Sequence, residues 1–300
     1  MITKKTVLIL GAGASTPYGY PTGATLYKTI CEELEGSGTY LHKALVDMNY
    51  DASEIADFVH ALRRCGKSSV DTFLEHRIDF LNIGKAAMAA ALIPREDEKK
   101  LFSEPDDDWY KYVFQQMNAT FNDFGKNKIV FITYNYDRSL EHFLHESLKN
   151  LSGRTDNECA AIVKKIPIIH LHGYLGGFSW QVKKGRAYSS KVEAGEIKKA
   201  STKIQVVSED VKKIKEFKRA HEALKSADQI FFLGFGYDEV NISRLNTKDW
   251  NTNKVIGGTS CGLTELKRKS VENLIGGSVG LHYNRYDKTK TFLEEVVSWI

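Results

Sequence analysis

The 300-residue sequence lacks the features that mark membrane, exported and disulfide-rich proteins. It has no apolar run of about 18 residues, the length that a membrane-spanning helix needs. Its start, MITKKTVLIL, leads into a glycine turn rather than the cleavage site of a signal peptide. Its four cysteines are scattered and form no CxxC pair, which argues against a zinc framework and a disulfide scaffold. We therefore expect a reduced, cytoplasmic protein that does not associate with a membrane.

The chain also lacks a strong charge of either sign. Its net charge is +4 and its pI is near 8.6, which permits acidic partners but does not require nucleic acid. The most basic stretch, residues 182–203, is interleaved with glutamates, as is typical of a solvated loop and helix face. We do not expect direct nucleic-acid binding.

Short apolar runs separated by helical stretches predict the fold class. Runs without polar alternation are typical of strands buried on both faces of a sheet. They lie at 6–10, 128–133, 166–172 and 229–235, with weaker candidates at 253–259 and 204–209. Helical stretches are expected at 137–151, 208–227 and 262–277. Strands that alternate with helices predict a doubly wound, mostly parallel, Rossmann-like α/β sheet.

Residues 36–127 show helical patterns and no strand-like run, so we interpret this interval as a large helical insertion or subdomain. The Rossmann-like domain then comprises residues 1–35 and 128–300. A second insertion is expected at 175–203, where Gly, Ser and Lys are frequent. The last ten residues, 291–300, place apolar side chains at helical spacing and are expected to dock on the body of the protein or on a partner.

The sequence GAGAS after the first strand predicts a nucleotide-binding turn. Gly11, Ala12, Gly13 and Ser15 allow a tight turn into a helix, where backbone N–H groups can approach a pyrophosphate. The alternative is a small-residue turn that only packs a helix on the sheet. Thr16 replaces the third glycine of GxGxxG, and no acidic strand end follows about 20 residues later. A hydride-transferring dehydrogenase is therefore not expected, although a nucleotide site is.

Polar residues also end the later strands. Asn135 and Asp137, in TYNYD (133–137), are poor strand formers, so they either enter a site or cap the next helix. In HLHG (170–173), His170 and His172 share a sheet face if the strand is regular. A metal pair is the alternative there, but no third ligand is evident, and we expect His170 to be a hydrogen-bonded core residue.

The motifs GAGAS, TYNYD, HLHG and GFGYDEVN (234–241) occur in this order, each after an expected strand. Together they resemble the sirtuin family, and they are closer to the zinc-free, sirtuin-like NAD-hydrolase domains of bacterial antiphage systems. The resemblance covers about residues 1–35 and 128–260. It implies that the Rossmann-like domain binds NAD as its substrate and uses no metal.

Two departures argue against protein deacetylation. Deacetylating sirtuins carry a GIPDFR-like segment, of which YGYPTG (18–23) keeps only Gly19 and Pro21. They also carry a four-cysteine zinc ribbon after the HG dipeptide, and no cysteine follows here before Cys261.

The resemblance assigns roles for cleavage of the nicotinamide–ribose bond. Nicotinamide leaves as a neutral molecule, so the carboxylic acid of ordinary glycosidases is not needed. Asn135 and His172 are the expected catalytic pair: the amide of Asn135 orients water or ribose, and His172 is the base, with a pKa suited to neutral pH. Asp137 supports them by holding the carboxamide or a neighbouring side chain. The residues expected to bind NAD are Gly11, Ala12, Gly13, Ser15, Thr16, Pro21, Thr133, Gly234, Gly236 and Asn241. The segment GGTSCG (257–262) is expected nearer the adenine, or else is a plain strand-end turn.

These inferences predict an NAD glycohydrolase that releases nicotinamide and ADP-ribose, acting as an antiphage defence effector. The alternatives are a non-catalytic sensor of NAD or ADP-ribose, and an NAD-dependent deacylase or ADP-ribosyltransferase. Unrestrained hydrolysis of NAD would poison the host cell. We therefore expect control by homo-oligomerisation through the helical insertion, or by a partner protein such as an ATPase or nuclease.

Overall fold

A six-stranded parallel sheet forms the centre of the computed structural model, which describes residues 1–206, 215–250, 253–275, 279–281 and 288–300. The strand order is β3-β2-β1-β4-β5-β6, and every neighbouring pair is parallel. The strands are β1 (Thr6–Leu10), β2 (Ile129–Thr133), β3 (Ile168–His170), β4 (Gln229–Leu233), β5 (Val255–Gly258) and β6 (Val279–Leu281). This is the strand order of the Rossmann fold, so the predicted Rossmann-like α/β class is confirmed.

Five of the predicted runs contain strands, and the sixth does not. Within 204–209, Ile204 forms only an isolated antiparallel bridge to Gly173, and residues 207–209 lie outside the described residues. The three-residue strand β6 is too short and too rich in glycine to give a sequence signal.

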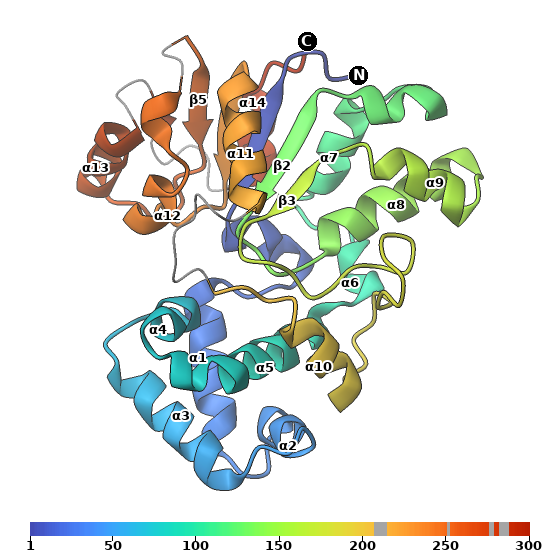
Figure 1. The fold of residues 1–300 in the computed structure, drawn as a ribbon. Helices are drawn as coiled ribbons and strands as arrows, with labels where there is room; N and C mark the ends of the chain where they lie inside the picture. The colour runs from blue at the N-terminus through green and yellow to red at the C-terminus, as the bar shows by residue number, and fades with distance from the viewer. Residues whose placement is uncertain (207–214, 251–252, 276–278, 282–287) are drawn as a thin grey trace.

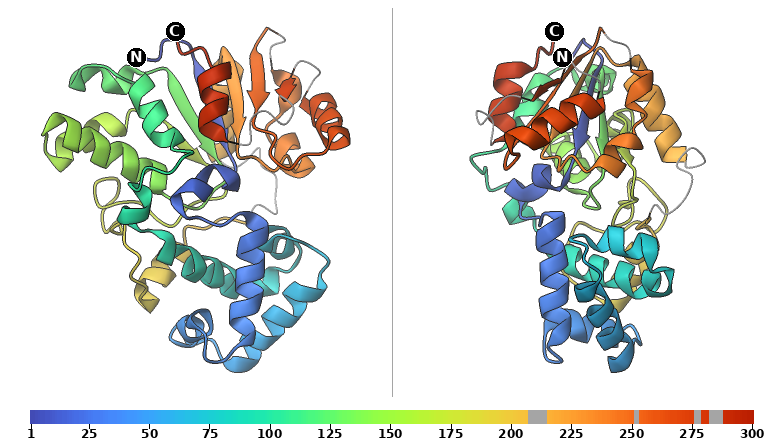
Figure 2. Two further views of the ribbon diagram at one scale, coloured as in Figure 1. Left: turned by 180° about the vertical axis from the view of Figure 1, so that it is seen from behind. Right: turned by 90° about the vertical axis from the view of Figure 1, so that its left-hand side faces the viewer.

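Helices cover both faces of the sheet (Figures 1 and 2). Successive residues of a strand point to opposite faces. Thus Val7 and Ile9 pack with α11, α12 and α13, whereas Leu8 and Leu10 belong to the core that includes α7, α8 and α14. The bounds are α7 (Trp109–Gln116), α8 (Ser139–Ser152), α11 (Lys215–Ser226), α12 (Glu239–Ser243), α13 (Glu265–Ile275) and α14 (Thr289–Val296), with the short α6 (Glu98–Leu101) and α9 (Asp156–Val163) beside α8.

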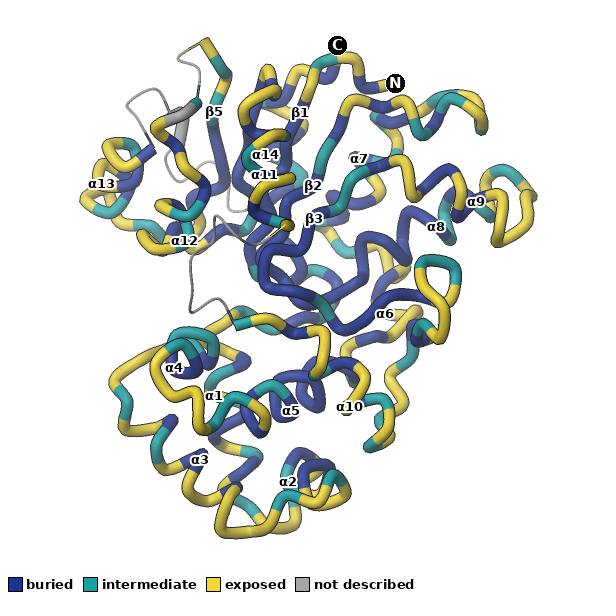
Figure 3. Tube along the Cα trace, viewed as in Figure 1, coloured by how far each residue is buried: buried dark blue, intermediate teal, exposed yellow. Residues whose placement is uncertain are grey.

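A second group of helices lies beyond the carboxyl ends of the strands and is called the helical lobe (Figure 1). It consists of α1 (Gly23–Glu35), α2 (Tyr40–Val46), α3 (Ala52–Arg64), α4 (Val70–His76), α5 (Leu81–Leu92) and α10 (Ala194–Ser201). Its centre is α5, whose alanine-rich sequence is buried along most of its length (Figure 3). Residues 36–127 contain no strand, and α10, from the segment 175–203, packs on α5.

The C-terminal helix α14 docks on the sheet. The rings of Phe292 and Phe231 meet edge to face with centroids 5.7 Å apart, and Leu293 is buried, whereas Ile300 is exposed. Among the described helices, none combines the length and apolarity needed to cross a membrane.

Candidate active site

One pocket lies between the carboxyl ends of β1, β2, β3 and β4 and the first turn of α4. In a Rossmann-type sheet this is where the strand order reverses and where ligands bind. The pocket has a volume of about 200 Å³. It is lined by Gly11, Ala12, Ser69, Asp71, Thr72, Glu75, Tyr134, Asn135, His172, Phe235, Gly236, Tyr237, Asp238, Val240, Asn241 and Arg244. The sequence-predicted residues Gly11, Ala12, Asn135, His172, Gly236 and Asn241 therefore meet in one cavity.

Hydrogen bonds donated by its amide nitrogen hold the Asn135 side chain in one orientation. Its Nδ2 donates to the carbonyl of Gly11 and to Ser15 Oγ, both at 2.9 Å. Both amide protons are thus used inside the protein. Among the described residues no group donates to Asn135 Oδ1, although the side chain is only 9% exposed and lines the pocket. The fold therefore presents a fixed hydrogen-bond acceptor to a ligand.

Asp137 lies behind Asn135 and does not line the pocket. Ser15 Oγ donates to Asp137 Oδ2 at 2.7 Å, so that Asp137, Ser15 and Asn135 form a chain. Asp137 also accepts hydrogen bonds from the backbone N–H and the hydroxyl of Ser139, where α8 begins. Burial raises the pKa of Asp137, and these donors oppose the shift. Of its expected roles, the structure shows the contact with a neighbouring side chain together with a helix-capping bond.

The glycine turn differs from the expected phosphate cradle. It leads into a 3₁₀ helix, Ala12–Tyr18, because Pro17 has no N–H to give the carbonyl of Gly13, which instead accepts from Thr16 Oγ1. The amides of Gly11 and Gly13 donate to the carbonyls of Leu233 and Gly234. These amides hold the loops after β1 and β4 together, so they are not available to a pyrophosphate.

Gly234 is required by this loop-to-loop packing. Its φ is +54°, and a Cβ there would collide with the backbone of Gly13 and Ala14. We expect Gly234→Ala to lower the free energy of unfolding by about 1–3 kcal/mol, because both strain and overpacking are introduced. Gly236→Ala is the matched control, since a Cβ at Gly236 meets no atom within 4 Å. Urea unfolding of both variants checks this, and equal stability of the two would contradict it.

His172 lines the pocket as a neutral, unpaired imidazole. It is 6% exposed, and its Nε2 is buried without a hydrogen-bond partner in the part of the chain that the structure describes. Burial, together with the positive charge of Arg244, lowers the pKa of His172 to about 3. This corrects the expectation of a pKa near neutrality, because the aromatic surroundings of Tyr134 and Tyr136 solvate an imidazolium poorly. His172 is therefore a weak base, and as a neutral imidazole at pH 7 it has one ring nitrogen that can accept a hydrogen bond.

This burial predicts a pH dependence of stability. In the unfolded chain the pKa of a histidine is about 6.5. The stability associated with neutral His172 is therefore complete above pH 6.5 and is lost as the pH falls from 6.5 to about 3. The free energy of unfolding should fall between pH 8 and pH 4 in both proteins, but less in His172→Gln than in the wild type. The difference between them should grow by up to about 1.4 kcal/mol for each pH unit below 6.5. Denaturant unfolding checks this with His60→Gln as an exposed-histidine control, and identical pH profiles would refute it.

His170 is a hydrogen-bonded core residue, as the sequence predicts. Its Nδ1 lies 3.0 Å from the carbonyl of Asn135, and its Nε2 lies 2.6 Å from Glu141 Oε1. Burial alone would lower the pKa of His170, but the carboxylate of Glu141 overcomes this and raises it. Both partners are acceptors, so an imidazolium satisfies both. His170 thereby fixes the backbone carbonyl of Asn135.

The helical lobe and α12 add residues that the sequence does not reveal. Asp71 and Glu75 lie four residues apart on α4 and line the pocket. Arg244, at the end of α12, donates to Glu75 Oε1 at 3.1 Å and joins the lobe to the sheet. The spacing of the two carboxylates places them on one helix face, but nothing in the sequence indicates that this face meets the strand ends.

The remaining predicted residues lie outside the pocket lining. Thr133 accepts the backbone N–H of Asn135, Thr16 is exposed, and Pro21 lies in the link to α1. Thr259, in the GGTSCG segment, accepts the N–H of Gly234 through its hydroxyl, so this segment supports the loop after β4.

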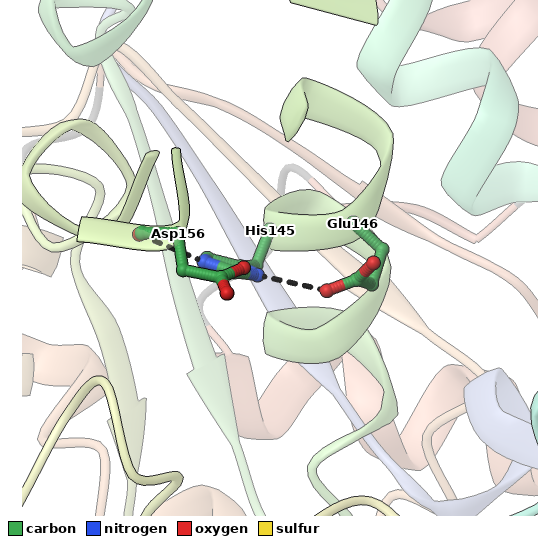
Figure 4. A group of neighbouring side chains, drawn as sticks. All are labelled: His145, Glu146 and Asp156. Carbon is green, nitrogen blue, oxygen red and sulfur yellow. Dashed lines mark hydrogen bonds and ion pairs between the residues drawn. The ribbon is translucent and has the colours of Figure 1, made fainter. Parts of the chain in front are cut away.

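One cluster of metal-ligating types occurs among the described residues: His145, Glu146 and Asp156 (Figure 4). Both ring nitrogens of His145 are engaged, with Glu146 Oε1 at 3.1 Å and the carbonyl of Asp156 at 3.2 Å. Lys149 already pairs with the Asp156 carboxylate at 2.8 Å. The cluster is a set of ordinary ionic contacts around α8, and none of its members lines the pocket.

No protein-family model matches the chain, and a comparison with curated proteins finds no match.

Proposed function

We propose that the protein is an NAD glycohydrolase that releases nicotinamide and ADP-ribose. The observation that carries this proposal is that Asn135 Oδ1 and His172 Nε2, neither of which has a hydrogen-bond partner among the described residues, line one pocket at the crossover point of a Rossmann-like sheet. The four ordered motifs that resemble sirtuin-like NAD hydrolases supply Gly11, Asn135, His172 and Gly236 to this pocket.

The chemistry requires little from the protein besides placement and charge. The C1′–N bond breaks with its electron pair going to the nicotinamide nitrogen, which becomes neutral. A water oxygen then bonds to C1′ and its proton passes to solvent. Asn135 Oδ1 accepts a hydrogen bond from this water or from a ribose hydroxyl, and His172 Nε2 accepts from a ribose hydroxyl. Fixed acceptors of this kind stabilise the oxocarbenium-like transition state without reorganisation.

The size of the pocket indicates which part of NAD it holds. A cavity of about 200 Å³ lies below the range of about 300–1,000 Å³ for drug-sized ligands. It suits the nicotinamide and its ribose rather than the whole dinucleotide. The engaged amides of the glycine turn agree with this, since they leave the pyrophosphate to bind outside the pocket.

Products from reactions with and without an acylated peptide separate the rival functions. A hydrolase forms nicotinamide and ADP-ribose in equal amounts, at a rate that the peptide does not change. A deacylase or ADP-ribosyltransferase consumes NAD only when the peptide or another acceptor protein is present. A sensor binds NAD and returns it intact.

Control of the activity belongs to the same proposal. A cytoplasmic NAD hydrolase of antiphage defence needs restraint in uninfected cells, and we place that control in homo-oligomerisation through the helical lobe or in a regulatory partner such as an ATPase or nuclease. The lobe suits this role because α4 contributes one wall of the pocket, so movement of the lobe changes the site. A dilute monomer that is as active as the concentrated protein, with no partner present, would refute this.

A further inference from the structure

The pocket carries an excess of negative charge. Three carboxylates line it, Asp71, Glu75 and Asp238, against one guanidinium, that of Arg244. Among the described residues no lysine lines it, and His172 is neutral. Such a pocket attracts a cation and repels a phosphate.

The two carboxylates on α4 differ in how their charge is compensated. Glu75 is paired with Arg244 at 3.1 Å, and each of these side chains is mostly buried. Asp71 has no cationic partner among the described residues. It accepts hydrogen bonds from two hydroxyls instead, those of Ser69 and Tyr136, which fix its position at the start of α4. Burial raises the pKa of Asp71 to about 6, and Glu75 adds to this, so the carboxylate is mostly ionised at pH 7.5.

Asn135 Oδ1 and the neutral imidazole of His172 can each accept a hydrogen bond from a ligand in the pocket. Asn135 Oδ1 and His172 Nε2 have no donor among the described residues, and the amides of Gly11 and Gly13 are engaged elsewhere. The pocket therefore complements a ligand that carries positive charge and hydroxyl donors. The N-ribosyl pyridinium half of oxidised NAD has both.

We propose that Asp71 and Glu75, called here the acidic wall, recognise the cationic pyridinium ring and determine the specificity of the pocket for N-ribosyl pyridinium compounds. This inference rests on the proposed function. It goes further because it assigns recognition of the ring to α4 of the helical lobe. It also requires that NADH binds weakly, since NADH has the same ribose, phosphates and adenine but a neutral ring.

Calorimetric titration with oxidised NAD and NADH tests the proposal in the non-cleaving Asn135→Ala protein. We expect oxidised NAD to bind at least about tenfold more tightly than NADH, the effect of one close charge interaction in a binding site. Adding Asp71→Asn and Glu75→Gln should bring the two affinities to within about threefold, mainly by weakening oxidised NAD. Asp57→Asn, an exposed carboxylate of α3 outside the pocket, is the matched control and should keep the preference.

Wild-type protein provides a second measurement that does not depend on the folding of Asn135→Ala. NADH should inhibit nicotinamide release only at concentrations about tenfold above the KM for oxidised NAD. Equal binding of the two forms, or a preference that survives in the acidic-wall variant, would overturn the inference while leaving the hydrolase intact. Absence of both binding and nicotinamide release would overturn the proposed function and the inference together.

Discussion

Asn135→Ala should reduce nicotinamide release by at least about a hundredfold, as the loss of one preorganised polar contact to a transition state does in other enzymes. The Asn135 side chain presents a hydrogen-bond acceptor, Oδ1, to the pocket, and hydrogen bonds fix both its amide nitrogen and its backbone. Its Nδ2 is bonded to Gly11 and Ser15, and its backbone carbonyl faces His170. Removing it takes away the group that orients water or ribose at C1′ in the proposed mechanism.

Ser15→Ala separates this chemical effect from a folding effect. Asn135→Ala also removes the hydrogen bonds from Nδ2 to the carbonyl of Gly11, which keeps the N–H of Ala14, and to Ser15 Oγ, and each loss costs about 0.5–1.5 kcal/mol of stability. Ser15→Ala removes a hydrogen bond of Asn135 and one of Asp137 but keeps Oδ1 in the pocket. It should lose stability and retain most activity. Initial rates, corrected for folded fraction by urea unfolding, check this. Equal loss of activity in both variants after this correction would contradict the assignment of the catalytic role to Asn135 Oδ1.

Glu96→Ala should destabilise the protein by about 3–5 kcal/mol, the cost of removing one partner of a buried ion pair. Glu96 and Arg138 have fully buried side chains and form two hydrogen bonds of 2.8 Å, while Arg186 adds a further contact at 3.3 Å. Arg138 also donates to the carbonyls of Gly176 and Ala187. Without Glu96, two guanidinium groups remain buried with one carboxylate fewer.

Glu98→Ala is the matched control, two residues away. Its carboxylate is 61% exposed and contacts His142 at 2.9 Å, so its loss should cost no more than about 1 kcal/mol. Denaturant unfolding gives both values. Because Arg138 directly follows the TYNYD motif, Glu96→Ala should also lower activity at temperatures where it is still folded. A stability loss equal to that of Glu98→Ala would contradict the assigned role of the buried pair.

The sheet could be predicted because its signal is local. Runs such as TVLIL and QIFFL carry a polar residue only at their first position, and all five side chains of β1 and of β4 are buried. The position of Asn135 and His172 at the carboxyl edge follows from the same pattern, since parallel strands end together. A strand as short as β6, with three residues, is too short to form a recognisable apolar run and is therefore not predicted.

The other half of the pocket could not be predicted from local patterns. The sequence of α4, which carries Asp71 and Glu75, has no feature that distinguishes it from other surface helices. Only the packing of the helical lobe brings α4 to the strand ends. The pKa of His172 depends on the same packing, because burial lowers it. The glycine turn shows the reverse case: its sequence suggests a phosphate site, but Gly11 and Gly13 hold two loops together.

The most direct test is nicotinamide release from NAD by the purified wild-type protein, followed by chromatography from dilute to concentrated protein. A range of concentrations is needed because assembly is the expected form of control. We predict that nicotinamide and ADP-ribose appear in equal amounts and that the rate per molecule rises with concentration. Recovery of intact NAD at every concentration, from protein that binds it, would contradict the hydrolase and leave a sensor.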